Sequence, residues 1–321
     1  MKILVTGAAG FIGFYVTKLL LHRGDKVIGL DNLNDYYDVS LKQARLAQLQ
    51  SHANFFFEKN DIVDKDAVHN LFRVHNPSRV IHLAAHAGVR YSLINPEAVA
   101  HANILGFVNI LEASRHHKLE HLVYASTSAV YGGNTDIPFS VDDRVDRPVS
   151  LYGASKRANE LMAYTYSRLF DIPATGLRFF TVYGPWGRPD MSYFKFTKNI
   201  INQVPIDVYN NGNHSRDFTY IDDIADGVIR ALDKLPSENY RLYNLGNKTS
   251  KKLMYYISIL EKFIGKKAIT NMLPMQTGDM IDTSADIENT FIDLGYAPKT
   301  SIETGLEKFV NWYKEYYGYN K

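Results

Sequence analysis

The sequence contains no cysteine among its 321 residues. This absence excludes disulfide bonds, thiolate-based metal sites and a thiol nucleophile. It is also typical of proteins from reducing compartments, so we expect a cytoplasmic location.

A strong charge imbalance and a long apolar run are missing as well. Lys and Arg number 36 against 34 for Asp and Glu, and a net charge of +2 gives no electrostatic reason to expect binding to nucleic acid or to a membrane. Lys18 interrupts the most apolar predicted helix, and a predicted strand begins at residue 3, so we expect neither a membrane span nor a signal peptide. Small anionic ligands remain possible, and we identify no metal site.

The most informative feature that is present is a glycine-rich turn at the start of the chain. The apolar run 2–5 predicts a buried strand, and apolar residues from Phe11 onward recur at helical spacing. Between them, Gly7 permits a tight turn, Gly10 lets the backbone approach phosphate groups, and Gly13 lets helix and strand pack closely. With the helix N-terminus, which includes Phe11 and Ile12, this turn predicts a site for the pyrophosphate of a dinucleotide.

An acidic residue follows at the position that such a site requires. Asp31 ends a second apolar run, 18 residues after Gly13, where a carboxylate holds the adenosine ribose hydroxyls. A carboxylate there repels a 2′-phosphate, and no Lys or Arg intervenes between Asp31 and Lys42. We therefore predict NAD as the cofactor and not NADP.

Strand and helix patterns alternate through the first half of the chain. Strands are predicted near 54–57, 80–83, 122–125 and 174–179, with helices around 64–75, 96–117 and 152–170. This alternation predicts an α/β fold with a doubly wound parallel sheet of the Rossmann type. After residue 180 the rhythm is irregular, which favours a smaller C-terminal α/β lobe that binds substrate. We place an interleaved boundary there, with 1–180 binding NAD and 181–321 forming the lobe. The predicted strands 204–208 and 242–245 could belong to either part. The pattern of 302–319 predicts a closing amphipathic helix.

Two polar groups suggest acid–base chemistry at the sheet edge. Tyr152 and Lys156 are four residues apart and share one face of a predicted helix, where the ammonium group can stabilise a phenolate. Ser126, Thr127 and Ser128 follow a predicted strand at its carboxyl end, the edge where parallel sheets bind ligands. A hydroxyl there can hydrogen-bond the oxygen that Tyr152 deprotonates.

Together these motifs resemble the extended short-chain dehydrogenase/reductase superfamily, and in particular its nucleotide-sugar epimerases. The resemblance covers nearly the whole chain and includes 31–32, 61–62, 82–85, Asn103, 126–128, Tyr152 with Lys156, 178–185 and 216–223. It implies catalytic roles for Thr127, Tyr152 and Lys156. The cofactor residues that it implies are Gly7, Gly10, Phe11, Ile12, Gly13, Asp31, Asn32, Asp61, Ile62, Leu83, Ala84, Ala85, Asn103, Ser126, Tyr152 and Lys156.

The resemblance also limits the reaction. Relatives that dehydrate or decarboxylate nucleotide sugars typically carry a carboxylate just after the catalytic Thr, whereas this chain has Ser128 and Ala129. The implied mechanism is therefore C4 epimerisation: Tyr152 removes the C4 hydroxyl proton, the C4 hydride passes to NAD⁺, the 4-keto sugar turns over, and the hydride returns to its other face. NAD should then be tightly held and not consumed.

The segments 87–92 and 178–191 resemble the UDP-glucuronate 4-epimerases, with Thr181 where hexose epimerases commonly carry Asn. The substrate residues implied are Arg90, Ser92, Thr127, Ser128, Thr181, Arg188, Arg216 and Asp279. Thr181, Ser128 and the loop of Arg90 offer donors for a C5 carboxylate, although Arg90 could equally face a phosphate or serve structure. Arg216 resembles a diphosphate clamp and Asp279 its partner on the nucleotide side.

Some alternatives remain open at this level. The same epimerisation could act on UDP-glucose or UDP-N-acetylglucosamine, and more distant possibilities are net oxidoreduction and a non-catalytic NAD-sensing protein. His86 replaces a common Gln, and we expect it to pack near the cofactor; Trp186 replaces an Arg of some members and leaves substrate breadth open. The resemblance further suggests a UDP-sugar substrate, a role in surface polysaccharide synthesis, and a homodimer joined through the helices that follow the fourth and fifth strands.

Overall fold

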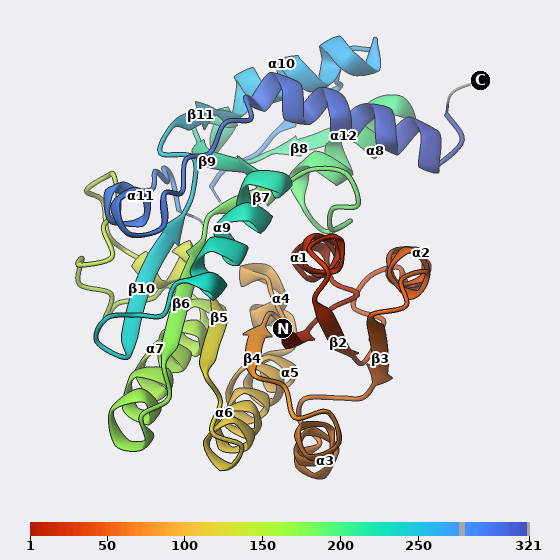
Figure 1. Ribbon diagram of the computed structural model, residues 1–321. Coiled ribbons are helices and arrows are strands. Elements are labelled where there is room, and N and C mark those ends of the chain that lie inside the picture. The colour runs from red at the N-terminus through yellow and green to blue at the C-terminus, as the bar shows by residue number, and fades with distance from the viewer. Residues whose placement is uncertain (276–279, 320–321) are drawn as a thin grey trace.

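The computed structural model describes residues 1–275 and 280–319 and is built around a seven-stranded parallel sheet. The strand order is β10-β6-β5-β4-β1-β2-β3, which reverses direction next to β1 (Figure 1). This order confirms the predicted doubly wound fold. The strands are β1 (Lys2–Thr6), β2 (Lys26–Asp31), β3 (Phe55–Lys59), β4 (Arg79–His82), β5 (His121–Thr127), β6 (Ala174–Phe179) and β10 (Tyr240–Leu245).

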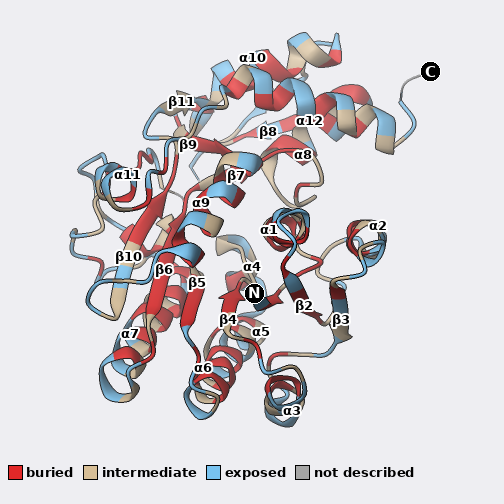
Figure 2. Ribbon diagram, in the orientation of Figure 1, coloured by how far each residue is buried: buried red, intermediate tan, exposed pale blue. Residues whose placement is uncertain are grey.

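Helices cover both faces of this sheet (Figure 1). One face carries α1 (Phe11–His22), α2 (Val39–Gln50) and α9 (Ile221–Asp233), and the other carries α3 (Lys65–His75), α6 (Gly106–His116) and α7 (Leu151–Phe170). Successive side chains of a strand point to opposite faces, so Ile3 and Val5 pack in one core and Leu4 in the other. The inner strands of the sheet, β1, β2, β4, β5 and β6, are accordingly almost completely buried (Figure 2).

The predicted helix at 96–117 is made of three pieces. These are α5 (Pro96–Ala100), a π-helical turn (His101–Leu105) and α6, and the short helix α4 (Val89–Ile94) precedes them. The π-helical turn contains Asn103, whose side chain is buried. Single π turns inside α-helices are frequent at functional sites, and this one lies just behind the carboxyl end of β4.

A smaller lobe stands over the carboxyl edge of the sheet (Figure 1). It contains a three-stranded sheet, β7 (Thr181–Tyr183), β9 (Ser215–Tyr220) and β11 (Ser250–Lys252), and a pair, β8 (Ile206–Val208) and β12 (Thr270–Met272). Its helices are α8 (Ser192–Ile201), α10 (Leu253–Ile264) and α12 (Ile302–Tyr316), while α11 (Glu288–Leu294) lies beside β10. The predicted closing helix is confirmed as α12, and Phe194 of α8 packs edge-on against its Tyr313, with ring centres 5.2 Å apart.

The chain returns to the large sheet after residue 180. Helix α9 packs beside α1, and β10 forms the edge strand next to β6, whereas β8 belongs to the smaller lobe. The two strands that could belong to either part therefore go to different sheets. A division at residue 180 stays a prediction, with α9 and β10 crossing it.

Among the residues that the structure describes, none of the helices has the length and apolar character needed to cross a membrane.

Candidate active site

The glycine turn lies between β1 and α1 and leaves no room for side chains. Gly7 has a φ of +72°, and a Cβ on it would stand 2.9 Å from the backbone nitrogen of Ala84. A Cβ on Gly13 would stand 2.0 Å from the carbonyl oxygen of Gly7. The turn can therefore be this tight only with glycine at both positions, and it brings the N-terminus of α1 to the carboxyl edge of the sheet.

Asp31 closes the same turn from the neighbouring strand. Its carboxylate accepts hydrogen bonds from the backbone N–H groups of Ala9 (3.0 Å) and Leu33 (2.9 Å). Burial raises the pKa of Asp31, while these two hydrogen bonds and the positive charge of Lys42 act in the opposite direction. The arrangement fixes an acceptor group at the end of β2, where ribose hydroxyls are bound in dinucleotide folds.

A cavity of about 480 Å³ runs along the carboxyl edge of the sheet from this turn. It is lined by glycines, by apolar side chains and by polar groups such as Asn32, Asp61 and Lys156, which suits an extended dinucleotide. The glycine cradle and the fixed carboxylate of Asp31 fit NAD. Predicted cofactor residues that line it are Gly7, Gly10, Phe11, Ile12, Gly13, Asp31, Asn32, Asp61, Ile62, Leu83, Ala84, Ala85, Ser126, Tyr152 and Lys156.

Asn103 differs from the other predicted cofactor residues because it does not line the cavity. Its side chain accepts a hydrogen bond from the backbone of His86 (2.9 Å) and donates to the same residue's carbonyl (3.1 Å) and to Ser155 (3.0 Å). Asn103 thus ties the cavity wall after β4 to α7.

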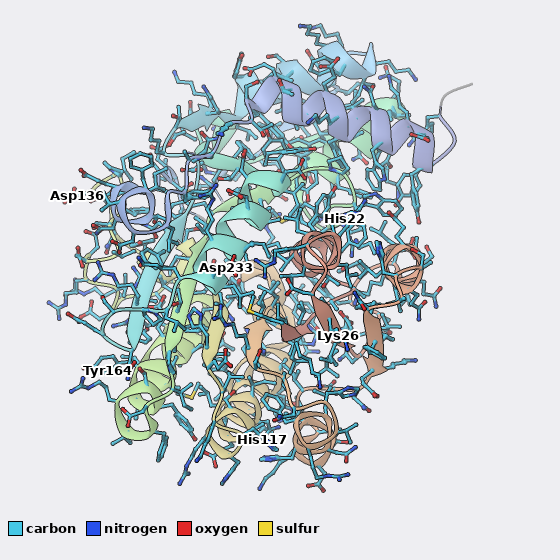
Figure 3. The ribbon with its side chains drawn as sticks, in the orientation of Figure 1. His22, Lys26, His117, Asp136, Tyr164 and Asp233 are labelled. Atoms are coloured by element: carbon cyan, nitrogen blue, oxygen red, sulfur yellow. The ribbon has the colours of Figure 1, made fainter. Side chains whose placement is uncertain are left out.

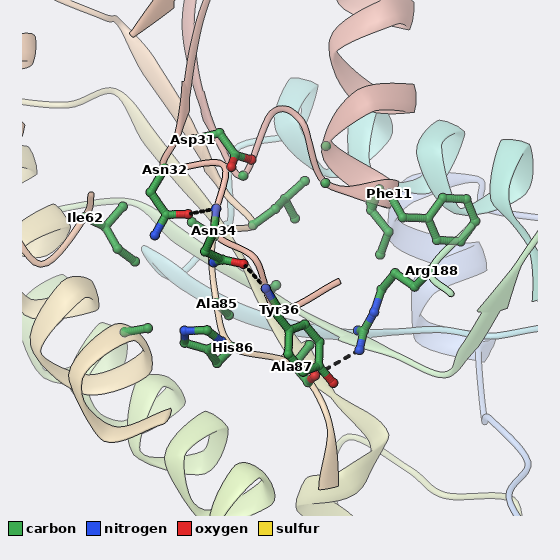
Figure 4. A pocket seen from close by; sticks show the side chains of 18 of the residues that line it. Phe11, Asp31, Asn32, Asn34, Tyr36, Ile62, Ala85, His86, Ala87 and Arg188 are labelled. Carbon is green, nitrogen blue, oxygen red and sulfur yellow. Dashed lines mark hydrogen bonds between the residues drawn. The ribbon is translucent and has the colours of Figure 1, made fainter. Parts of the chain in front are cut away.

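The segment after β2 contributes lining residues that the sequence motifs do not indicate, namely Asn34, Tyr36 and Lys42 (Figure 4). The ammonium group of Lys42 donates to the carbonyl of Asn34 (2.6 Å) and to its side-chain oxygen (2.8 Å). His86 also lines the cavity and stacks on Tyr91, with ring centres 5.2 Å apart. This packing agrees with the role expected for His86.

Tyr152 reaches the cavity because α7 begins very close to the turn after β5. A Cβ on Gly153 would stand 2.6 Å from the carbonyl oxygen of Ala129, and Ser150 caps the helix by accepting from the N–H of Gly153 (3.0 Å). The first turn of α7 therefore sits against the 3₁₀ turn 128–131. This contact places Tyr152 and Thr127 together in the cavity wall, where the Thr127 hydroxyl acts to lower the pKa of the phenol.

The charges around Tyr152 decide its protonation. Burial raises the pKa of the phenol, whereas the Thr127 hydroxyl and the positive charge of Arg188 lower it. Lys156 lies one turn further along α7 and is buried. Burial lowers the pKa of Lys156 to about 8, and the negative charge of Glu160 opposes this shift. The cation acting directly on the phenol in this structure is thus Arg188.

A second cavity of about 270 Å³ adjoins the first under the smaller lobe. Thr127, Tyr152 and Arg188 line both cavities, so the acid–base pair lies at their junction. Three further predicted substrate residues line the second cavity: Ser128, Thr181 and Arg216. Hydroxyl donors and two guanidinium groups suit an anionic ligand.

Arg188 is held in place by Asp190. Its guanidinium group donates to both carboxylate oxygens of Asp190 (3.0 and 2.5 Å) and to the carbonyl of Ala87 (2.9 Å). The charge of Arg188 keeps the pKa of Asp190 low, although burial acts to raise it. Asp190 belongs to the predicted motif 187–191, but the sequence gives no signal for this pairing.

Three predicted substrate residues are placed elsewhere or not described. The buried hydroxyl of Ser92 donates to the carbonyl of Val89 (2.6 Å), and the guanidinium of Arg90 lies 5.2 Å from the ring centre of Tyr209. Neither residue lines the two cavities. Asp279 lies outside the described residues. Trp186 packs against Trp312, with ring centres 5.2 Å apart, and lines neither cavity, so it does not itself limit the substrate.

A buried ion pair behind the site was also not predicted. Glu160 accepts two hydrogen bonds from Arg178 (2.8 and 3.0 Å) and one from Ser126 (2.6 Å). The hydrogen bonds of Glu160 with Arg178 and Ser126 join α7, β6 and the end of β5. Glu160, which lies one turn after Lys156 on α7, therefore holds β5, the strand that carries Thr127.

Comparison with known proteins agrees with this geometry. Residues 3–246 match the family model described as the NAD dependent epimerase/dehydratase family. The chain is 49% identical to protein CapI of Staphylococcus aureus over 99% of both chains, and 47% identical to UDP-glucuronate 4-epimerase 4 of Arabidopsis thaliana over 100% of this chain and 77% of that protein. The crystal structure of UDP-glucuronic acid 4-epimerase from Bacillus cereus, in complex with UDP-glucuronic acid and NAD, superposes with a TM-score of 0.94 at 36% identity, covering 99% of this chain and 100% of the other. The chain therefore belongs to the NAD dependent epimerase/dehydratase family.

Proposed function

We propose that this protein is an NAD-dependent UDP-glucuronate 4-epimerase, which interconverts UDP-glucuronate and UDP-galacturonate. The observation that carries the proposal is the position of Tyr152 and Thr127 at the junction of a dinucleotide-shaped cavity and a cavity lined by anion-binding groups. The Arabidopsis and Bacillus relatives are named for this activity. Since the cofactor ends the reaction as it began it, the protein needs to hold NAD and not to release it.

The residues around Tyr152 carry out the proton transfer. Tyr152 accepts the proton of the C4 hydroxyl as phenolate and returns it to the 4-keto intermediate after the sugar has turned over. Thr127 holds the C4 oxygen by hydrogen bonding. Because burial raises the pKa of the Tyr152 phenol, positive charge is needed to make it a base; Arg188 lowers this pKa directly, and Lys156 lies one turn further along α7. Bound NAD supplies the hydride acceptor and donor at C4.

The side chains of the second cavity make the protein specific for its sugar. Ser128, Thr181 and Arg188 surround the place where a C5 carboxylate would lie, and a carboxylate is costly to bury without such donors. Arg216 lies at the same cavity and is assigned to the diphosphate. Direct contacts of Arg90, Ser92 and Asp279 with the substrate stay predictions.

The proton chemistry is confined to one oxygen. Ser128 and Ala129, the two residues after Thr127, carry no carboxylate that could remove a proton from C5. This absence supports epimerisation over dehydration or decarboxylation. The similarity to CapI supports a role in capsule or other surface polysaccharide synthesis, and we assign the protein to the cytoplasm, where nucleotide sugars are available.

A homodimer is part of the same proposal. Exposed apolar side chains gather on α4 and α7, two helices that contact each other: Leu93 and Ile94 on α4, and Leu161, Tyr164 and Leu169 on α7. Tyr164 is half exposed at the edge of the sheet, where its ring packs against Tyr240 of β10 with ring centres 5.3 Å apart (Figure 3). Leu161→Glu should convert the dimer into a monomer in analytical ultracentrifugation, and a wild-type monomer would contradict this assignment.

The function is tested by incubating the purified protein, without added NAD, separately with UDP-glucuronate, UDP-glucose and UDP-N-acetylglucosamine, and following the sugar protons by NMR. Conversion of UDP-glucuronate alone to its C4 epimer supports both the substrate and the retained cofactor. Conversion of a neutral sugar instead would contradict the carboxylate pocket. Activity only after NAD is added would contradict retention, and no activity even then would favour a non-catalytic NAD-binding protein.

A further inference from the structure

Tyr36 connects the two sides of the cofactor cavity. It lies in the segment after β2, on the side of Asp31, and its hydroxyl donates to the carboxylate of Asp190 (3.1 Å) in the segment after β7. Tyr36 lines the large cavity and Asp190 lines the second one. In Figure 4 Tyr36 lies between His86 and Arg188. This hydrogen bond joins the segment after β2, which forms one wall of the cofactor cavity, to the loop that carries Arg188.

The ring of Tyr36 also contacts the segment after β4. Its centre lies 4.5 Å from that of Tyr91 and 6.1 Å from that of His86. Gly88, with a φ of +137°, passes directly under it, since a Cβ there would stand 3.2 Å from the Tyr36 hydroxyl. The ring is therefore held at the meeting point of segments that follow three different strands.

Arg45 binds both of the segments that the contact between Tyr36 and Asp190 connects. This arginine is fully buried in α2 and donates to the carbonyls of Trp186 (3.0 and 2.6 Å) and Gly187 (3.1 Å). It also donates to the carbonyl of Ala9 in the glycine turn (2.9 Å). Arg45 further donates to the hydroxyl of Tyr37 (2.7 Å), the residue after Tyr36, so one buried side chain holds both segments that the contact between Tyr36 and Asp190 connects.

The charges favour a closed contact at neutral pH. Burial and the neighbouring Asp190 raise the pKa of Tyr36 to about 12, so its hydroxyl keeps the proton that it donates. Asp190 is ionised because Arg188 lowers its pKa. The hydrogen bond therefore joins a neutral donor to a charged acceptor, which is stronger than a bond between two neutral groups.

We propose that the hydrogen bond between Tyr36 and Asp190 closes the cofactor cavity and slows the exchange of bound NAD. The inference rests on the proposed function in one respect, the identity of the cofactor. The closure adds a means of retaining NAD. For a bound NAD to dissociate, Tyr36 has to move away from Asp190, and the loop that carries Arg188 then loses one of the contacts that hold it.

The test is the rate at which bound NAD exchanges with isotopically labelled NAD, measured without sugar by mass spectrometry of the filtered protein. Tyr36→Phe keeps the ring and removes the hydroxyl, and it should accelerate exchange about tenfold, the effect of losing one hydrogen bond to a charged group. Tyr255→Phe is the matched control, because its hydroxyl donates to the carboxylate of Glu303 on a helix that lines neither cavity. Its exchange rate should equal that of the wild type.

Asp190→Ala removes the acceptor of the Tyr36 hydroxyl and also the partner of Arg188, which lines the cofactor cavity. The share of the contact with Tyr36 is therefore measured by adding Tyr36→Phe to this variant. The double variant should exchange no faster than the faster single variant, because both changes break the same bond. Multiplying effects, or a Tyr36→Phe rate equal to that of the wild type, would overturn the proposal.

Failure of this proposal differs visibly from failure of the proposed function. A protein that retains NAD but leaves UDP-glucuronate unchanged would contradict the epimerase assignment and leave the closure intact. Wild-type exchange that is complete within seconds would overturn the closure, even if the protein epimerises UDP-glucuronate.

Discussion

The two cavities are built in different ways. Many residues that line the cofactor cavity lie at the ends of adjacent strands of one sheet, such as Gly7 after β1, Asp31 at the end of β2 and Ala84 after β4. The residues that line the sugar cavity alone come from segments that are distant in sequence, such as Ser128 after β5, Thr181 on β7 and Arg216 on β9. The first is determined by local geometry, and the second by long-range contacts between side chains.

The largest effect is expected at the junction of the two cavities. Tyr152→Phe should lower turnover of UDP-glucuronate by about 10²–10⁴-fold, the usual contribution of a positioned acid–base group. The fold and the bound NAD should be unchanged, as measured by thermal unfolding and by the NAD released on denaturation. Turnover within a few-fold of the wild type would remove Tyr152 from the acid–base role.

The cofactor side should be intolerant of a single methyl group. Gly13→Ala places a Cβ 2.0 Å from the carbonyl of Gly7, so the turn has to open, which we expect to destabilise the protein by about 3 kcal/mol and to abolish NAD retention. Gly133→Ala is the control, because a Cβ there meets nothing within 4 Å. Urea unfolding and NAD content measure both; retention of NAD by Gly13→Ala would contradict the role of the turn.

Much of the cofactor side could be predicted from the sequence because its geometry leaves few alternatives. Gly7 and Gly13 act through backbone positions that only glycine allows, and Asp31 acts through a carboxylate at the end of β2. The alternation of predicted strands and helices likewise leaves few arrangements other than a parallel sheet. Asn103 shows the limit: its motif was identified, but its amide turns toward His86 and Ser155.

The sugar side could be predicted only in part. Thr181 and Arg188 line the cavity as their motifs suggested, whereas Arg90 and Ser92 do not. The partners that position Arg188, namely Asp190 and Tyr36, lie 154 residues apart from each other, and no local pattern links them. The ion pair of Glu160 and Arg178 escaped prediction because each looks like an ordinary charged residue of a helix or strand.

Lys156 is a cation buried at the cofactor cavity, and its charge makes the stability of the protein depend on pH. The pKa of Lys156 is about 8 in the folded protein and about 10.4 when exposed, so between these values the unfolded chain binds more protons and the free energy of unfolding rises with pH. Below pH 8 the cost of burying the protonated Lys156 lowers the free energy of unfolding by its full amount, about 3 kcal/mol. Lys156→Met removes this cost.

The measurement is urea unfolding of both proteins, stripped of NAD, at pH 7 and pH 10. The stability of Lys156→Met relative to the wild type should be greatest at pH 7 and should decrease toward pH 10. A difference that is the same at both pH values would mean that Lys156 is not a depressed cation.

The smallest effect is expected at the sugar side, where several donors share one ligand. Thr181→Asn should weaken the use of UDP-glucuronate relative to UDP-glucose by about 1–3 kcal/mol in kcat/KM, the value of a hydrogen bond to a charged group. The use of UDP-glucose is the internal control for folding and for NAD. An unchanged ratio between the two sugars would remove Thr181 from the carboxylate site.

Epimerisation of UDP-glucuronate in D₂O, with NMR detection of the product, tests whether proton transfer occurs only at the C4 oxygen. The product should be UDP-galacturonate that carries protium at both C4 and C5, since hydrogen at C4 leaves and returns inside the closed site and no residue removes the proton at C5. Deuterium at C5 would contradict this expectation by requiring a carbon base that Ser128 and Ala129 cannot provide, and deuterium at C4 would contradict transfer within a retained cofactor.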